Sequence, residues 1–255
     1  MSVAIDWKMR GERRAVEVIT ALEQNDHILD ELLLDLGCGQ GHITQALLAK
    51  TSCKIICADI SLNLLEVSRT NAPGCEFIQC DGGFLPFRDS VFKTIVSNDV
   101  LEHTPYENGV RLVTEARRVT TYNGKVYLSA MNRWEILEPH WLIPFFTWTP
   151  RFMWDRFFPL AVRFSPIAKK GPRPNIRYSQ HYFPYTRKMM EDLLEGSRFV
   201  DMTSLYAREK VSDPDYIGSK RTRAVVKFLQ SLKLTPLALV LAKKVSVLVF
   251  VCVKN

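Results

Sequence analysis

Short apolar runs alternate along the first half of the chain with segments whose apolar residues recur at helical spacing. The runs lie at 32–36, 53–60, 76–81, 94–99 and 125–130. Helices are expected at about 11–24, 42–50, 61–71 and 106–119. A continuous apolar run bounded by glycine or polar residues is typical of a strand that is covered on both faces. The pattern therefore predicts one large α/β domain, with residues 1–255 as a single unit.

The pattern breaks at Met131. Up to Phe183 the chain is rich in aromatic residues and proline, and we treat 131–183 as an insertion within the domain. Nine aromatic residues fall between 141 and 164: Trp141, Phe145, Phe146, Trp148, Phe152, Trp154, Phe157, Phe158 and Phe164. Prolines prevent one long helix here, and charged residues such as Arg151 and Asp155 exclude a transmembrane span.

Regular structure is expected to resume after the insertion. The sequence predicts a helix at 186–195, a sixth strand at 199–207, a basic helical region from 219 into the 240s, and a last buried strand at 245–253. A membrane helix over 235–253 is excluded because Lys243 and Lys244 would lie in mid-span.

A glycine-rich turn follows the first predicted strand. Asp35, Gly37, Gly39 and Gly41 form D-x-G-x-G-x-G, with Cys38 inside the turn. The spacing differs from the dinucleotide fingerprint G-x-G-x-x-G, and no G-K-[ST] of a phosphate-binding loop is present. Glycines at such a turn allow unusual dihedral angles and let a ligand approach the backbone closely. The motif resembles motif I of the class I methyltransferases that use S-adenosylmethionine.

Polar residues follow the next three strands at one per strand. Asp59 ends the second, Asp81 ends the third, and Asn98 lies at the end of the fourth, just before the turn V-L-E-H at 100–103. The resemblance implies that Asp59 accepts hydrogen bonds from the ribose hydroxyls of S-adenosylmethionine and that Asp81 lies near its adenine amino group. It implies the following cofactor-binding residues: Asp35, Gly37, Cys38, Gly39, Gly41, Asp59, Ile60, Asp81, Gly82 and Asn98.

The resemblance also implies the fold. In this family a Rossmann-like sheet of seven strands has the order 3-2-1-4-5-7-6, with the last strand antiparallel and helices on both faces. The aromatic-rich insertion follows strand 5. In such enzymes this segment closes over the substrate.

Charge and cysteine content narrow the possible binding partners and the cellular compartment. The net charge is +7, and basic residues gather at 163–188 and 220–233, which suits RNA, anionic lipid headgroups or an acidic substrate, or a solvated basic face. The six cysteines form no C-x-x-C pair, so no metal is expected and free thiols in a reducing compartment are favoured. No signal peptide is visible, so a cytoplasmic protein is expected.

Three interpretations of the insertion remain open. It can line a pocket for a large apolar acceptor, lie at a membrane interface where Trp and Phe accompany Arg and Lys, or form an extra core layer or dimer contact. The first two favour a lipophilic or small-molecule acceptor and an anionic membrane surface as a peripheral site. An RNA methyltransferase is the less favoured alternative. A non-catalytic scaffold that binds the cofactor is the alternative from another class.

A general base is needed only if the acceptor must lose a proton. The candidate bases are His103, His140, His181, Glu138 and Tyr182. We select His103, because the resemblance places it nearest the methyl group, and His140, which lies in the insertion, as the catalytic candidates.

Overall fold

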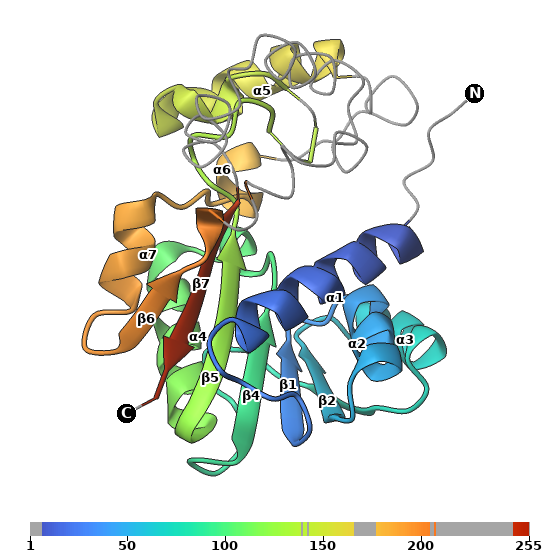
Figure 1. Cartoon of the computed structure of the whole chain (residues 1–255). Coiled ribbons are helices and arrows are strands. Elements are labelled where there is room, and N and C mark those ends of the chain that lie inside the picture. Colours follow the sequence, from blue (N-terminus) through green and yellow to red (C-terminus); the bar gives the residue numbers. More distant parts are fainter. Residues whose placement is uncertain are drawn as a thin grey trace, which may run out of the picture.

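The computed structural model describes residues 7–138, 140–141, 143–165, 177–204, 207 and 247–254. Its centre is a seven-stranded sheet with the order β3-β2-β1-β4-β5-β7-β6 (Figure 1). The strands are β1 Leu32–Leu36, β2 Lys54–Asp59, β3 Glu76–Gln79, β4 Phe92–Ser97, β5 Thr120–Ala130, β6 Arg198–Asp201 and β7 Leu248–Val253. Strands β1 to β5 pair in parallel, and β7 is antiparallel to both β5 and β6. The predicted fold class and strand order are confirmed.

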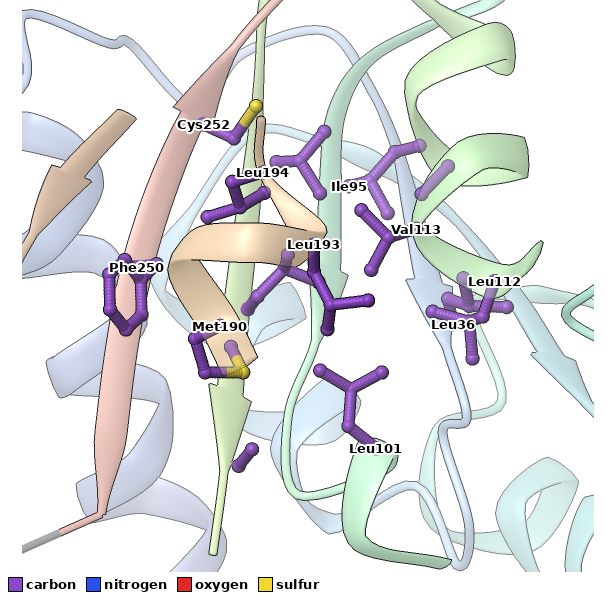
Figure 2. Close-up of a cluster of buried hydrophobic side chains, with 14 of the residues drawn as sticks. Leu36, Ile95, Leu101, Leu112, Val113, Met190, Leu193, Leu194, Phe250 and Cys252 are labelled. Carbon is purple, nitrogen blue, oxygen red and sulfur yellow. The ribbon is translucent and has the colours of Figure 1, made fainter. Parts of the chain in front are cut away.

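Helices cover both faces of the sheet, and each face has its own hydrophobic core. The helices of the domain are α1 Trp7–Glu23, α2 His42–Lys50, α3 Leu62–Asn71, α4 Tyr106–Val119 and α7 Arg187–Leu193. One core lies between the sheet, α1 and α2, and the other between the sheet, α4 and α7. Figure 2 shows the second core, in which side chains of α4, α7 and β7 converge.

The two cores explain why β7 is apolar throughout. Along β7, Leu248, Phe250 and Cys252 pack into the α4–α7 core, whereas Val249 and Val251 pack into the α1–α2 core. Successive side chains of a strand point to opposite faces, so a central strand needs apolar residues at every position.

Several predicted boundaries are wrong. β5 begins at Thr120 rather than 125, because Thr120 pairs with Phe92 of β4 before a register shift leads to the pairing of Lys125 with Thr94. β6 ends at Asp201 rather than 207: the Asp201 side chain accepts a hydrogen bond from the Thr203 amide at 2.9 Å, and residues 203–204 are helical. β3 ends at Gln79, and β7 begins at Leu248. The predicted basic helical region lies outside the described residues.

The insertion forms a small layer beyond the carboxyl ends of the strands (Figure 1). Its elements are the short 3-10 helices η2 Phe146–Trp148 and η3 Val162–Phe164 and the helices α5 Arg151–Ala161 and α6 Tyr178–His181. A third hydrophobic cluster holds it together, built from Ile143, Phe146, Trp154, Phe158, Val162 and Tyr178. Within the described ranges, no helix has the length and apolar character needed to cross a bilayer.

Candidate active site

The glycine turn lies where β1 meets α2, and its three glycines meet different surroundings. All three have positive φ angles, +81°, +54° and +76° for Gly37, Gly39 and Gly41. A Cβ at Gly37 would lie 2.3 Å from Val100, and one at Gly41 would lie 2.3 Å from Ser68. A Cβ at Gly39 would meet no atom within 4 Å. Gly37 and Gly41 are therefore needed for packing, whereas Gly39 borders open space in which a ligand can approach the backbone.

Asp35 supports this turn from the interior. It is buried, and Thr44 of α2 donates a hydrogen bond to its carboxylate. Burial raises the pKa of Asp35 to about 6. The structure thus places Asp35 behind the turn, and its role as a direct cofactor contact stays a prediction.

Asp59 lies beside the open space at Gly39. Its Oδ2 accepts a hydrogen bond from the Gly39 amide at 2.9 Å, and its Oδ1 accepts one from the Ser61 amide at 2.8 Å. An ionised carboxylate has about four acceptor positions, so acceptor capacity remains for two vicinal hydroxyls. Ile60, the next residue, exposes its side chain beside it.

The remaining predicted cofactor residues come from neighbouring strand ends. The Cys80 amide donates to the Asp59 carbonyl at 3.1 Å. This bond holds the segment before Asp81 next to the end of β2. The Asp81 carboxylate accepts from the Gly83 amide at 2.8 Å, and a Cβ at Gly82 would lie 3.0 Å from Leu112. Asn98 accepts a hydrogen bond from the Ser129 hydroxyl at 3.1 Å.

Taken together, these residues fit a nucleoside cofactor. The open space at Gly39 lets a ligand approach the backbone. The Asp59 carboxylate has acceptor capacity for a ribose, and the exposed Ile60 side chain suits contact with a base. In the part of the chain that the structure describes, no group of three His, Cys, Asp or Glu side chains could hold a metal ion.

An ion pair that sequence reasoning missed connects α1 with the end of β4. Arg14 contacts Asp99 and Glu17, each at 2.8 Å, and its side chain is almost completely buried. Burial by itself would raise the pKa of Asp99, but the Arg14 and Arg10 charges hold the pKa below its usual value. The apolar spacing of the helix was the only signal in the sequence, so a helix could be predicted here but not its contact with Asp99.

A cavity of about 280 Å³ lies between the turn after β4 and the insertion. Its wall includes Glu102, His103, Arg151, His181, Tyr182 and Phe183. The turn forms the 3-10 helix η1 Leu101–His103, and the Phe183 amide donates to the Glu102 carbonyl at 2.6 Å, which fixes the insertion to it. Of the described aromatic residues, those at 182–183 rather than those at 141–164 line this cavity.

The two predicted catalytic histidines come together beside this cavity, although 36 residues separate them in the chain. The ring centroids of His103 and His140 are 5.3 Å apart, and the His140 ring lies 4.2 Å from that of Tyr182. His140 Nδ1 is 2.8 Å from Glu138 Oε1, and the carboxylate also accepts the amide of Trp141 at 2.6 Å. The candidate bases His103, His140, Glu138, His181 and Tyr182 therefore occupy one neighbourhood, and their roles stay predictions.

Burial changes the ionisation of the groups at the turn. It lowers the pKa of His103, and the nearby His140 lowers it further. Burial and the Asp99 charge raise the pKa of Glu102 well above its usual value. The lowered pKa therefore favours the unprotonated imidazole of His103, and the raised pKa favours the protonated carboxyl group of Glu102. Glu102 is a site residue that sequence reasoning missed, because nothing in the sequence shows its burial.

We expect Asp59→Ala to weaken S-adenosylmethionine binding by about 1–3 kcal/mol, because the ribose hydroxyls lose their acceptor. Calorimetric titration of the purified protein measures this loss. Glu76→Ala is the matched control, since Glu76 is exposed at the opposite end of the neighbouring strand β3. An affinity equal to that of the Glu76→Ala variant would show that Asp59 is not the ribose partner.

Comparisons with known proteins agree with this geometry. A family model described as "Methyltransferase domain" matches residues 34–128. Among solved structures, phosphoethanolamine N-methyltransferase 2 of Haemonchus contortus, in complex with S-adenosyl-L-methionine, has a TM-score of 0.55 at 15% identity and covers 95% of this chain and 52% of its own. A SAM-dependent methyltransferase from Methanosarcina mazei has a TM-score of 0.52 at 20% identity and covers 72% and 87%. These structures support the fold.

Relatives in sequence differ in what their names say they methylate. The human "Probable tRNA methyltransferase 9B" is 32% identical over 160 residues, which are 60% of this chain and 32% of the relative. The "Ubiquinone biosynthesis O-methyltransferase" of Coxiella burnetii is 26% identical over 136 residues, 50% of this chain and 57% of the relative. The chain spans only 22–32% of the length of the first curated relatives that it matches. Residues 34–128 thus match the methyltransferase domain model, and the whole sheet has the fold of solved methyltransferases, one of which is in complex with S-adenosyl-L-methionine.

Proposed function

We propose that this protein transfers the methyl group of S-adenosylmethionine to a lipophilic or small-molecule acceptor that binds in the cavity between η1 and the insertion. The observation that carries the proposal is the composition of the cavity wall. His103 comes from the turn after β4, five residues beyond the predicted cofactor residue Asn98, while Tyr182 and Phe183 come from the insertion. The cavity thus joins the cofactor side of the domain to a wall of aromatic rings.

The cofactor supplies an activated methyl group, so the main contribution of the protein is to align the acceptor and exclude water. Such positioning can supply about 7–11 kcal/mol of the barrier. The insertion walls the cavity, and the Arg151 guanidinium lies 4.0 Å from the Phe183 ring centroid and donates to the Ser179 carbonyl at 3.1 Å. These contacts hold α5 and α6 together around the acceptor.

His103 is the proposed general base for an acceptor hydroxyl. The His103 ring lies at the wall of the proposed acceptor cavity, and one of its ring nitrogens can accept the proton. Its lowered pKa keeps that nitrogen unprotonated at neutral pH, as a base requires.

His140 is a proposed positioning residue. The buried Glu138 carboxylate holds its Nδ1, and the ring lies against both His103 and Tyr182. A carboxylate behind an imidazole fixes its tautomer and its orientation. His140 thereby keeps the other two rings in place at the cavity.

A tRNA acceptor is the second candidate, because the relative "Probable tRNA methyltransferase 9B" shares 32% identity over 160 residues. The name of the relative "Ubiquinone biosynthesis O-methyltransferase" favours the lipophilic acceptor instead. A walled cavity suits a small ring better than a base that must be extruded from a folded RNA.

Cytoplasmic location is part of the proposal, and the free state of all six cysteines supports it.

The deciding experiment incubates the purified protein with methyl-labelled S-adenosylmethionine and a total cell extract, and then counts label in the organic, nucleic-acid, protein and aqueous fractions. We expect label in the organic or the small-molecule fraction. Label in RNA would replace this proposal with the second candidate. No label in any fraction, with cofactor binding confirmed by titration, would contradict both and favour a non-catalytic scaffold.

A further inference from the structure

Helix α5 is apolar on both of its sides. Trp154 and Phe158 point inward and are buried in the third hydrophobic cluster. On the outer side, Phe152, Phe157 and Leu160 expose 86%, 42% and 53% of their surface. The inner contacts account for Trp154 and Phe158 but leave the exposed apolar side chains of the outer side without a structural explanation.

A second exposed apolar group lies in the same insertion, just before α5. Trp148 contacts Trp134 and Phe145 edge to face, with ring centroids 6.1 Å and 5.2 Å apart. All three are exposed, and the Trp148 indole donates to the Glu135 carbonyl at 3.0 Å. Phe145 has a φ of +57°, a strained angle for a bulky residue, and yet its ring faces solvent. Exposed apolar groups of this size mark interaction sites.

The charge beside these groups has one sign. Arg156 and Arg163 are exposed at the outer side of α5 and η3. The acidic residues of the described insertion are either buried or bound to another helix of the insertion. Glu135 and Glu138 are buried, and Asp155 accepts the amide and the hydroxyl of Ser179 at 2.8 Å and 2.6 Å. The outer face therefore combines aromatic side chains with arginine. This combination complements a surface in which an apolar interior lies beneath a negatively charged outer layer.

We propose that the outer face of the insertion, formed by Phe152, Phe157, Leu160, Arg156 and Arg163, docks onto an anionic lipid bilayer. Phenylalanine and leucine enter the boundary between headgroups and acyl chains, while the arginines pair with lipid phosphates. Arg151 of the same helix lines the cavity, so the helix that meets the bilayer also walls the proposed acceptor site. The docking rests on the exposed side chains and holds whichever acceptor is methylated.

The experiment is co-sedimentation of the full-length protein with vesicles of phosphatidylcholine alone or of equal parts phosphatidylcholine and phosphatidylglycerol. We expect binding to the anionic vesicles that weakens as salt rises. Joint replacement by Phe152→Ser, Phe157→Ser and Leu160→Ser should lower the partition coefficient about tenfold or more, since apolar burial is lost. Arg156→Gln and Arg163→Gln should each lower it about fivefold at low salt.

The matched controls are Ile28→Ser and Tyr122→Ser, which remove side chains that expose 75% and 70% of their surface in the α1–β1 connection and in β5. They should partition like the unmodified protein. Thermal denaturation and affinity for S-adenosylmethionine verify that each variant is folded, and they do not depend on vesicles or on the acceptor. Equal losses in the control variants, or no binding of the unmodified protein to anionic vesicles, would overturn the proposal. Binding to total tRNA through the same residues, without vesicle binding, would reassign the face to RNA.

Discussion

Gly39→Val should abolish measurable binding of S-adenosylmethionine, with a loss of affinity of about 100-fold or more, equivalent to about 2.7 kcal/mol. A Cβ at this position would have no atom within 4 Å, and Asp59 lies at the edge of the open space. A branched side chain would occupy the volume in which the cofactor approaches the backbone. Calorimetric titration measures the affinity, and circular dichroism verifies the fold.

The backbone strain of the substitution can be separated from its effect on binding. Gly196, in the turn between α7 and β6, has a φ of +75° and likewise no neighbour within 4 Å. Gly196→Val therefore carries a similar strain of about 1–3 kcal/mol away from the site and should bind the cofactor normally. Gly41→Ala should instead lower stability, because its Cβ would lie 2.3 Å from Ser68. Equal cofactor affinity for Gly39→Val and Gly196→Val would refute the assignment of the turn.

His103→Ala should reduce kcat by about 10²–10⁴-fold if the acceptor loses a proton to this ring. The affinity for S-adenosylmethionine should change by less than about twofold, because His103 lines the acceptor cavity rather than the glycine turn. Steady-state kinetics with the labelled fraction as acceptor measures kcat. A variant with full turnover would remove His103 from the mechanism.

The pH dependence gives a second readout of the same role. A base works when it is unprotonated, so a lowered pKa preserves activity as the pH falls. Burial and His140 lower the pKa of His103 from its ordinary value of 6.5. In the pH profile of kcat/KM, we therefore expect the midpoint of the acidic limb below pH 6.5. His181→Ala, which alters the cavity wall but leaves the His103 ring in place, should raise KM and keep the pH of the acidic limb. An unchanged limb in His103→Ala would assign it to another group.

The proposed cofactor half of the site lies in segments whose sequence signals are local. The turn with Gly37, Gly39 and Gly41 follows a buried strand, and Asp59 and Asp81 come directly after the next two. Parallel strands bring their carboxyl ends to one edge of the sheet, so residues that follow successive strands meet there whatever the rest of the chain does. Strand boundaries were less predictable: β5 starts at Thr120 through one pair with Phe92, and a register shift separates that pair from the apolar run.

The acceptor half depended on contacts between distant segments. Sequence reasoning named His103 and His140 separately, but only the packing of the insertion on η1 places their rings 5.3 Å apart and puts Glu138 behind His140. Burial, which lowers the pKa of His103 and raises that of Glu102, is likewise a property of the assembled fold.

The sequence by itself thus determined the strands and the glycine turn, because apolar runs and glycines act through neighbouring residues. The strand order followed from the resemblance of the motif to the class I methyltransferases. The sequence also located the aromatic insertion, but it could not show which of the aromatic side chains are buried and which are exposed. Tertiary structure alone decided that Trp154 and Phe158 face a core while Phe152 and Phe157 face outward. The physical reason is that an apolar residue in a sequence shows only a preference for burial. Which residues bury it depends on the packing of segments that are distant in the chain.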